Sequence, residues 1–557
     1  MRRHRGGPWA RVAMGLILSA LLSGCGKGEE PRQAEPAANQ EAPRATRGYI
    51  VISIDTLRAD HLGCYGYPRP TSPFLDSLAE RATLFEEAYA QYPSTLVSHM
   101  SMFTGLHPRE HGVYPPNSVL APEVETFPEA FRRQGFRTAG FTEGGYMSGR
   151  FGFRRGFEQF AARARNRNRP LHQTFRRGVR FLEGLKPDER FLLFLHTYSV
   201  HTPYDAPEEY RKPFWPGEPP AGAIPATGPA FGQHNASGGT LPEPVVGWLT
   251  ALYDAGISQT DEVLRGFFAD LERLGLADDV TVIVTSDHGE ELQDHGRLNH
   301  EQLYRETMRV PLLVIHPDQR TAVRHGGVVQ LVDLAPTLYE LARVQPKGKP
   351  TGTSLAGLLG SPAAPRPGSA WMEGFGARAV YRGEQRRLDS LLLFDQPEGT
   401  WVSRSVAVDT PGGRELSFQA RSYQEPRRLT VRQGDAVLAE VALTPEWTPV
   451  RLPLPNPGRL RLEADGCAVA APEREHDKWD VRCQAFQVRG LRLSHVEVYD
   501  VSQDPGQRRD LSRERTRETR MLLRDLLAFN PKPVAEATTQ ELDPELEKNL
   551  RALGYLQ

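Results

Sequence analysis

Cysteine is scarce in this sequence, with four residues in a chain of 557. Cys25 lies in the N-terminal leader considered below, so three cysteines are left for the folded protein. Cys467 and Cys483 could form a disulfide within one small module, which would leave Cys64 as a buried free thiol. This distribution argues against cysteine as a metal ligand, so we expect oxygen and imidazole groups to hold any bound metal ion.

An excess of charge is also missing, because 68 Lys and Arg residues stand against 69 Asp and Glu residues, for a formal net charge of −1. Without a basic surplus the composition gives no reason to predict nucleic acid as a partner. A chain of 557 residues is too long for one small core. We therefore expect a large catalytic domain and at least one further module.

Long hydrophobic runs are absent, and the apolar run near the N-terminus, VAMGLILSALL, is too short to cross a bilayer comfortably. It follows the basic start MRRHR, so we interpret residues 1–25 as a signal peptide rather than a permanent anchor helix. The sequence Leu22-Ser23-Gly24-Cys25 resembles the bacterial lipobox, in which the cysteine is lipidated and becomes the first residue of the mature protein. An ordinary cleaved signal with a chance cysteine is the alternative.

The predicted lipid on Cys25 would anchor the protein to a membrane outside the cytoplasm. Gly26, in place of an aspartate after the cysteine, favours the periplasmic face of the outer membrane. Residues 26–47 are rich in Pro, Ala, Glu and Gln and nearly free of large apolar side chains. Such a segment cannot bury enough surface to fold, so we predict a flexible tether.

What the chain does contain is a series of apolar, β-branched runs that end in polar residues. The first is GYIVISID, which ends at Asp55, and further runs are FRTAGFT, RFLLFLHTY, DVTVIVTSD and PLLVIH. Helical patterns separate them, which predicts an α/β domain over 48–400 with a mostly parallel sheet between helices. Ligands bind beyond the carboxyl ends of such strands, where Asp55, His196 and Asp287 all fall.

The pattern changes from about residue 400. Short alternating runs punctuated by Gly, Pro and Asp predict an antiparallel β-sandwich over 401–492, followed by a closing strand and helices over 493–557. We interpret the sandwich as a packing module rather than a carbohydrate-binding one, because its aromatic candidates are few, namely Trp447 and Trp479. The leucines of the LRALGYL ending should dock onto the catalytic domain. Residues 211–247 are rich in Pro and Gly, so we expect a long loop that shapes the mouth of the site.

Two carboxylates and an imidazole should meet at one edge of the sheet. Asp55 ends the first strand, and Asp287 and His288 end TVIVTSDHG, with Gly289 allowing a sharp turn. For one isolated Asp, capping of the next helix is the better interpretation. Three such residues, with a hydroxyl from YPSTLVSH nearby, instead predict a site for one divalent cation: Mn²⁺, Mg²⁺ or Ca²⁺, with Zn²⁺ as a further candidate.

A hydroxyl at the start of a helix suits attack on a tetrahedral oxyanion. Metal coordination is one of the few ways to activate a hydroxyl at neutral pH. The N–H groups of a helix N-terminus favour an anionic group such as phosphate or sulfate. The segment YPSTLVSH, followed by the helical SMFTGLHP, has these ingredients.

Three long segments occur in the order found in the sulfatase family of the alkaline phosphatase superfamily, and each resembles that family. They are residues 54–113, which begin IDTLRADHLG; residues 285–314, which begin TSDHGEEL; and residues 495–512, which begin HVEVYDVSQDPG. The resemblance covers about 48–400 and resumes near 493, so that the sandwich is an insertion. It implies an alkaline-phosphatase-like fold and a hydrolase that acts on sulfate or phosphate esters.

Carried over residue by residue, the resemblance places metal ligands at Asp55, Thr95, Asp287 and His288, with Thr95 as the nucleophile. The family often has a second Asp after the first, where this chain has Thr56. Formylglycine sulfatases need Cys or Ser in a C-x-P-x-R setting, and this chain instead reads Thr95-Leu96-Val97-Ser98-His99. Threonine at this position is similar to lipoteichoic acid synthase, phosphoethanolamine transferases and nucleotide pyrophosphatase/phosphodiesterases.

Histidines complete the predicted site. The family's HxPY stretch matches His201, which the resemblance makes a catalytic or substrate-contacting residue, and His300 falls where relatives have Lys or His near the transferred group. His99 and His196 are predicted to contact substrate. Two-metal relatives need an acid four residues before His201, and Thr197 stands there, so one metal ion is expected. For Ser98 we prefer a helix-capping role.

Two hypotheses remain open at this point. The first is a metal-dependent hydrolase or transferase that acts on a phosphate or sulfate ester of a small molecule, glycan or lipid, with Thr95 favouring phosphoester or phosphodiester chemistry. The second is a catalytically inactive surface lipoprotein that binds glycans. The lost second Asp at Thr56 favours the second hypothesis, while retention of Asp55, Thr95, Asp287 and His288 favours the first.

Overall fold

The computed structural model describes residues 43–557 with internal gaps. The gaps are 163–169, 238, 362–367, 375–376, 385–386, 397–400, 403–404, 411–414, 454–457, 470–482, 490–492 and 554–557. The predicted signal peptide (1–25), the lipid-bearing Cys25 and most of the tether (26–47) therefore lie outside the described residues, as does Trp479. Among the helices that are described, none is both long and apolar enough to cross a membrane.

An eight-stranded sheet forms the centre of the catalytic part, in the order β11-β2-β10-β7-β1-β6-β4-β5. Its strands are β1 (Gly48–Ile54), β2 (Thr83–Tyr89), β4 (Arg137–Thr142), β5 (Gln159–Ala162), β6 (Phe191–Thr197), β7 (Val280–Thr285), β10 (Arg309–Ile315) and β11 (Val323–Gln330). β1 runs parallel to both neighbours, β6 and β7, whereas β10 runs antiparallel to β7 and β2. The mostly parallel sheet expected from the apolar runs is confirmed.

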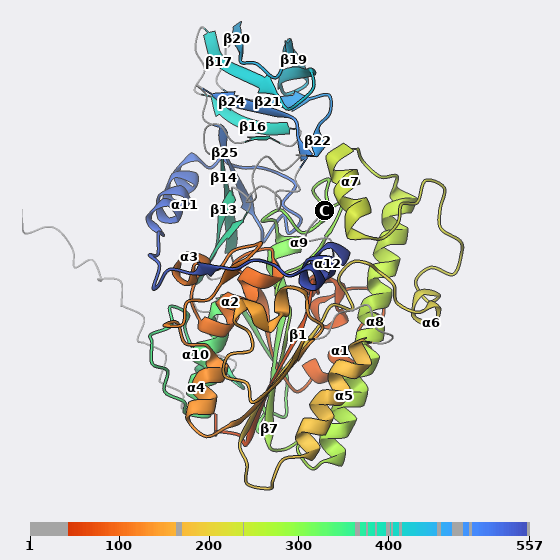
Figure 1. Ribbon diagram of the computed structural model, residues 1–557, viewed down its shortest axis with the longest axis vertical. Coiled ribbons are helices and arrows are strands. Elements are labelled where there is room, and N and C mark those ends of the chain that lie inside the picture. The colour runs from red at the N-terminus through yellow and green to blue at the C-terminus, as the bar shows by residue number, and fades with distance from the viewer. Residues whose placement is uncertain are drawn as a thin grey trace, which may run out of the picture. The chain divides into compact units, whose positions relative to one another are not determined.

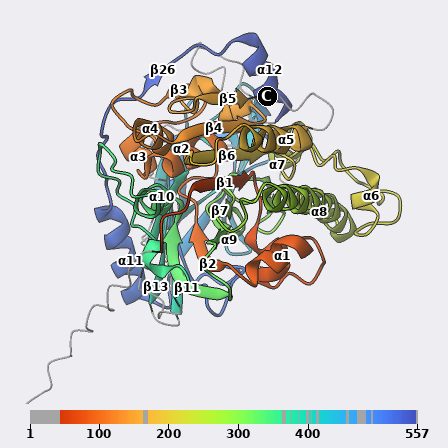
Figure 2. The ribbon, with the colours of Figure 1, turned by 90° about the horizontal axis from the view of Figure 1, so that it is seen from below.

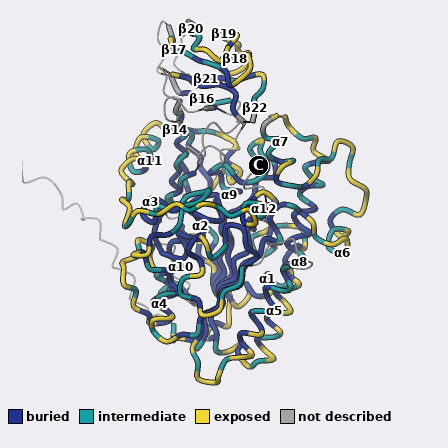
Figure 3. The backbone as a smooth tube through the Cα atoms, viewed as in Figure 1, coloured by how far each residue is buried: buried dark blue, intermediate teal, exposed yellow. Residues whose placement is uncertain are grey.

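Helices cover both faces of this sheet (Figures 1 and 2). One layer holds α2 (Thr95–Thr104), α4 (Phe127–Arg133) and α10 (Leu334–Ala342), and the other holds α1 (Pro73–Ala79), α5 (Pro170–Glu183) and α8 (Glu243–Arg273). Side chains alternate along β1, so that Tyr49 and Val51 join the first core while Ile50 and Ile52 join the second. Figure 3 shows the resulting buried centre. A strand buried on both faces explains why GYIVISI is a continuous apolar run.

A second, four-stranded antiparallel sheet, which the sequence analysis did not identify, follows the catalytic sheet. It has the order β12-β13-β14-β25, with β12 (Gly368–Gly374), β13 (Ala377–Glu384), β14 (Arg387–Gln396) and β25 (Leu493–Asp500). The predicted closing segment is β25, which pairs with β14 so that Gln396 faces Leu493 across the ladder. α11 (Thr516–Ala528) packs Leu522 and Leu526 against this sheet.

Two further four-stranded antiparallel sheets lie in the chain between β14 and β25, and they share one apolar core. The first contains β15 (Trp401–Val402), β24 (Phe486–Arg489), β17 (Glu415–Ser422) and β20 (Thr448–Pro453). The second contains β16 (Ser405–Thr410), β21 (Gly458–Ala464), β18 (Arg427–Gln433) and β19 (Ala436–Leu443). The expected antiparallel sandwich is therefore present. Cys467 is disulfide-bonded, and the side chain of Cys483 is outside the described part.

Two expectations need correction. Residues 211–247 are not one long loop, because they contain α7 (Gly228–Ser237) and the start of α8. The side chain of Asn235 on α7 exchanges hydrogen bonds of 2.8 and 3.0 Å with the backbone of Leu298, which ties this segment to the chain that leads to His300. Cys64 is a free thiol as expected, but it is half-buried rather than buried, because it lies in the short 3-10 helix Gly63–Tyr65, which has no buried residue.

The C-terminal helix α12 (Pro544–Ala552) docks by its leucines, as predicted. Asp543 caps its first turn by accepting hydrogen bonds from the backbone of Glu545 and Leu546. Leu550 is fully buried in the core that also contains Tyr49 and α2.

Replacing Leu550 with alanine should lower the free energy of unfolding by about 2–5 kcal/mol, because it removes a fully buried side chain and leaves a cavity. Urea denaturation followed by circular dichroism measures this loss. Leu527 on α11 is 51% exposed, and Leu527→Ala should change stability by less than about 0.5 kcal/mol. Equal effects of the two substitutions would contradict the docking of α12.

Candidate metal and nucleophile site

The parallel strands bring the predicted acids to one edge of the sheet. β1 lies between β6 and β7, with Ser53 level with both His196 and Thr285. Asp55 follows β1 directly, and Asp287 lies two residues beyond the end of β7. The carboxyl ends of three adjacent strands therefore carry Asp55, His196 and Asp287 together, as the strand pattern predicted.

Thr95 enters this edge from the first turn of α2. The helix begins at Thr95, and the N-cap residue Ser94 has an extended backbone with φ of −155°. Leu96, Met100 and Phe103 are fully buried in the core and fix the position of the helix. The Thr95 hydroxyl donates a 3.2 Å hydrogen bond to Oδ2 of Asp55.

Asp55, Asp287 and His288 form a compact, fully buried group. One ligand atom from each of the three lies within 4.8 Å of the others. Oδ1 of Asp55, Oδ2 of Asp287 and Nε2 of His288 are buried without a hydrogen bond. Buried polar atoms of this kind are costly unless something compensates them. The donor set, two carboxylates and one imidazole, fits a divalent cation.

The charges of the two acids depend on each other. Burial, and then the Asp287 carboxyl, raise the pKa of Asp55 well above its usual value. Burial acts in the same direction on Asp287, but the imidazoles of His288, His99 and His196 outweigh it and lower the pKa of that carboxyl. Two carboxyl groups this close carry one negative charge far more easily than two, because two ionised carboxylates repel each other. A cation between them would offset this repulsion.

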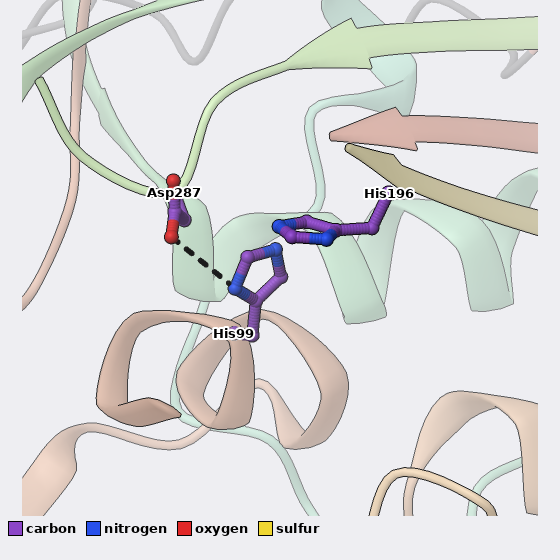
Figure 4. Close-up of side chains that lie close together, drawn as sticks. All are labelled: His99, His196 and Asp287. Atoms are coloured by element: carbon purple, nitrogen blue, oxygen red, sulfur yellow. Dashed lines mark ion pairs between the residues drawn. The ribbon is translucent and has the colours of Figure 1, made fainter. Parts of the chain in front are cut away.

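His99 and His196 lie close to Asp287, and the His99 ring is directed toward the Asp287 carboxylate (Figure 4). Nδ1 of His99 is 2.8 Å from the Thr95 carbonyl and 3.4 Å from Oδ2 of Asp287, and its Nε2 is 2.8 Å from the Ser53 hydroxyl. Nε2 of His196 is 3.1 Å from Oδ2 of Asp55. Burial lowers the pKa of both imidazoles. With Asp287, they form a second group of ligand atoms within 4.8 Å that could hold a metal ion.

His201 and His300 face each other on the other side of the site. Their Nε2 atoms are 3.3 Å apart, and each ring directs its Nδ1 at a backbone carbonyl, so a hydrogen bond between the two Nε2 atoms requires a shared extra proton. Nδ1 of His300 is 3.0 Å from the carbonyl of Pro93, two residues before Thr95, and its ring centre is 4.3 Å from that of His288. Burial, and then His288, lower the pKa of His300 to about 3. The predicted catalytic histidines are thus adjacent to the predicted metal ligands.

Ser98 and Gly289 have roles that differ from those expected. Ser98 does not cap α2, because Ser94 occupies the N-cap position; the Ser98 hydroxyl instead donates a 2.6 Å hydrogen bond to the carbonyl of Asp287. At Gly289 a β-carbon would lie 1.9 Å from the carbonyl oxygen of Glu306. Close approach of two backbones, rather than a sharp turn, therefore requires glycine at this position.

Glu143 at this edge was not predicted from the sequence, and Thr56 was noted there only as the replacement for a second Asp. Glu143 is buried and accepts hydrogen bonds of 2.7 Å from the Thr197 hydroxyl and 3.0 Å from the Tyr198 amide, which holds the end of β6. It follows the strand FRTAGFT directly, as Asp55 follows the first strand, so the same signal could have found it. Thr56 has a φ of 56°, which is strained for a β-branched residue, and its buried hydroxyl has no hydrogen bond.

A cavity of about 750 Å³ lies beside the segment that leads to Thr95. Its lining includes Tyr92, Tyr114, Arg109, Arg378 and Lys532. Glu373 also lines it and forms a 2.7 Å ion pair with Arg109. The cavity therefore offers aromatic surface and a surplus of positive charge close to the nucleophile candidate.

Comparison with known proteins agrees with this geometry. The family model described as Sulfatase matches residues 47–344. Arylsulfatase K of Homo sapiens is 24% identical over 393 residues, which cover 63% of this chain and 71% of that protein. An ulvan-active sulfatase of Formosa agariphila is 23% identical over 379 residues, which cover 62% of this chain and 70% of that protein.

Solved structures share the fold at low sequence identity. A protein in complex with its substrate D-glucosamine-2-N,6-O-disulfate superposes with a TM-score of 0.57 at 15% identity, over 87% of this chain and 97% of the other. The phosphonate monoester hydrolase of Agrobacterium radiobacter gives a TM-score of 0.54 at 15% identity, over 90% of this chain and 100% of the other. Because the family model covers more than half of the chain and includes the buried acids, histidines and Thr95, the chain belongs to the sulfatase family.

Proposed function

We propose that the protein is a metal-dependent hydrolase of a phosphate or sulfate ester in which Thr95 is the nucleophile. The observation that carries the proposal is the position of the Thr95 hydroxyl, 3.2 Å from Asp55 and next to the buried acids of the candidate metal site. Membership of the sulfatase family supplies the reaction class, a displacement at a tetrahedral sulfur or phosphorus. Threonine in place of the formylglycine precursor favours phosphoester or phosphodiester substrates.

The chain's own groups are arranged for such a displacement. A divalent cation held by Asp55, Asp287 and His288 would lower the proton affinity of a nearby hydroxyl. The Thr95 oxygen then attacks phosphorus or sulfur, and the bond from that atom to the ester oxygen breaks. His99 is a positioning residue in this proposal, because it joins the Thr95 carbonyl to Asp287 and Ser53.

The pair His201–His300 is proposed to serve the leaving group. Both rings are buried, and each directs its Nδ1–H at a backbone carbonyl, so a neutral ring presents a lone pair at Nε2. A proton taken up between the two Nε2 atoms would give an N–H that can donate to the departing oxygen or to a non-bridging oxygen. Water then attacks the threonine ester, releases phosphate or sulfate and restores the Thr95 hydroxyl. The cavity beside Tyr92 and Arg378 supports a bulky, anionic leaving group such as a glycan.

Thr95→Ala should reduce turnover about a thousandfold or more, because no other group replaces the attacking oxygen. The measurement uses aryl sulfate, phosphate monoester, phosphodiester and phosphonate substrates, and the ratio of the four rates assigns the ester class. Thr104→Ala is the matched control, since Thr104 lies at the other end of α2 and its hydroxyl donates to the Met100 carbonyl. Full activity of Thr95→Ala on every substrate would eliminate Thr95 as the nucleophile.

Asp55→Asn should raise the stability of the metal-free protein and weaken its binding of a metal ion. In metal-free protein the amide removes one of two repelling carboxyls and can donate to Asp287, so the free energy of unfolding should rise by about 1–3 kcal/mol. Added Mn²⁺ should stabilise the wild type but not the variant. Chelator-treated protein, unfolded thermally with and without Mn²⁺, gives both quantities.

Equal stabilisation of the two proteins by Mn²⁺ would remove Asp55 from the ligand set. Elemental analysis of the wild type also tests the inactive alternative, since that hypothesis requires the absence of a stoichiometric divalent ion. A stoichiometric ion lost in Asp55→Asn is the result expected for the hydrolase.

We further propose that the protein is held at a membrane outside the cytoplasm by a lipid on Cys25. The support is the leader MRRHR-VAMGLILSALL-SGC and the polar segment 26–47.

Cys25→Ser should move the protein from the membrane fraction to the soluble extract, because the acylated side chain is lost. Fractionation of cells fed a labelled fatty acid measures both location and labelling. A variant that keeps the label and stays in the membrane fraction would exclude Cys25 as the anchor.

A further inference from the structure

One sheet of the sandwich carries a row of arginines on its outer surface. Alternation along β17 directs Phe418 and Ala420 into the apolar core and Gln419 and Arg421 away from it. The ladder places the partners of these residues on the same surface. We define the arginine face by its ladder members Ser417, Gln419, Arg421, Arg451, Gln487 and Arg489, together with Trp447, whose ring contacts Arg421 and Arg489.

Trp447 holds two of the guanidinium groups. The guanidinium carbons of Arg421 and Arg489 lie 4.9 and 4.3 Å from the centre of its ring. Such cation–π contacts restrict a long side chain without changing its charge. Trp447 was considered as a sugar-stacking residue in the sequence; the structure shows that it supports arginines.

The same two arginines also donate hydrogen bonds to the side-chain amides of glutamines. Nε of Arg421 donates a 2.7 Å hydrogen bond to Gln487, and Nε of Arg489 donates to Gln419. The ladder pairs Arg421 with Gln487 and Arg489 with Gln419. The cross-strand partner of each arginine is therefore a neutral glutamine. Two positive groups are thus pre-organised on adjacent strands.

The outer surface of the other sandwich sheet is built differently. There Arg428 lies 3.4 Å from Glu440 and Arg432 lies 4.0 Å from Glu463, so each of these two arginines has an acid within ion-pair distance, although the ladder pairs Arg432 with Arg461. On the arginine face, the exposed Arg451 adds a third cation on β20, opposite Ser417. Among the described side chains, Glu446 is the acid next to Trp447 in the sequence. The described part of this face thus favours an anionic partner.

We propose that the arginine face is a non-catalytic binding surface for a sulfated polysaccharide. Planar guanidinium groups match the paired oxygens of a sulfate ester and remain charged at any physiological pH. Cations on neighbouring strands about 5 Å apart suit anionic groups repeated along a chain rather than one small anion. Ser417 and the glutamine amides between them supply partners for sugar hydroxyls. The proposal does not depend on which ester the catalytic site cleaves.

The test measures binding of heparin to the full-length mature protein by isothermal titration calorimetry. The double variant Arg421→Ala/Arg489→Ala should bind about tenfold more weakly, since two charge-assisted contacts are lost. The matched control is Arg428→Ala/Arg432→Ala, which removes the same charge from the other sheet and should bind within about twofold of the wild type. Equal weakening of the two variants, or no weakening of the first, overturns the proposal.

Control polymers and a catalytic-site variant, measured in the same binding assay, identify the ligand and the site to which it binds. Dextran, which is neutral, should not bind, and polyglutamate should bind at least about tenfold more weakly than heparin. Polyglutamate binding as tight as heparin binding would make the surface a general anion site and overturn the assignment. Thr95→Ala should bind heparin like the wild type; loss of binding in that variant would place the polysaccharide in the catalytic site.

A conservative double variant tests whether weaker binding could result from misfolding. Arg421→Lys/Arg489→Lys keeps both charges but loses the planar fork, so it should retain the wild-type unfolding temperature and bind several-fold more weakly. Wild-type affinity in this variant would show that charge alone, rather than the held guanidinium groups, binds the polysaccharide, and would overturn the assigned role of Trp447.

Discussion

The structure depends on one electrostatic constraint, the burial of Asp55 and Asp287 at the same edge of the sheet. Parallel pairing of β1 with β7 brings both acids there, and neither can move without disturbing the strands that hold the core together. The surrounding imidazoles and the raised pKa of Asp55 relieve the repulsion only in part. One oxygen of each carboxylate remains without a hydrogen bond, and such locally unfavourable groups are typical of functional sites.

The rest of the site is organised around these acids. α2 presents Thr95 to Asp55, and His99, one turn later on the same helix, contacts Asp287. The two residues therefore connect the hydroxyl to both acids through one rigid element. His300 approaches from the segment after β7 and contacts the chain just before Thr95. The helix, the strand ends and the loop thus constrain one another, which fixes the position of the Thr95 hydroxyl relative to the two acids.

Some features of the fold and of the candidate site could be predicted from the sequence and others could not, for physical reasons. The positions of Asp55 and Asp287 were predictable, because a carboxylate that follows a buried parallel strand must lie at the carboxyl-end edge of the sheet. Thr95 could be placed by its motif at a helix start. The pairing of β14 with β25 could not be read, because the partners lie about a hundred residues apart and only the folded sheet aligns them. The bond from Ser98 to Asp287 was missed for the same reason, since local rules describe capping and not tertiary contacts.

The register between β14 and β25 also bears on how this architecture could have arisen. Gln396 and Leu493 face each other across the ladder, so the sandwich leaves the chain and returns to it at neighbouring points. An ancestral hairpin loop at this point could have accepted a whole domain without altering any strand order in the hydrolase. The same junction would permit exchange of the inserted domain among lineages while the reaction centre is inherited unchanged.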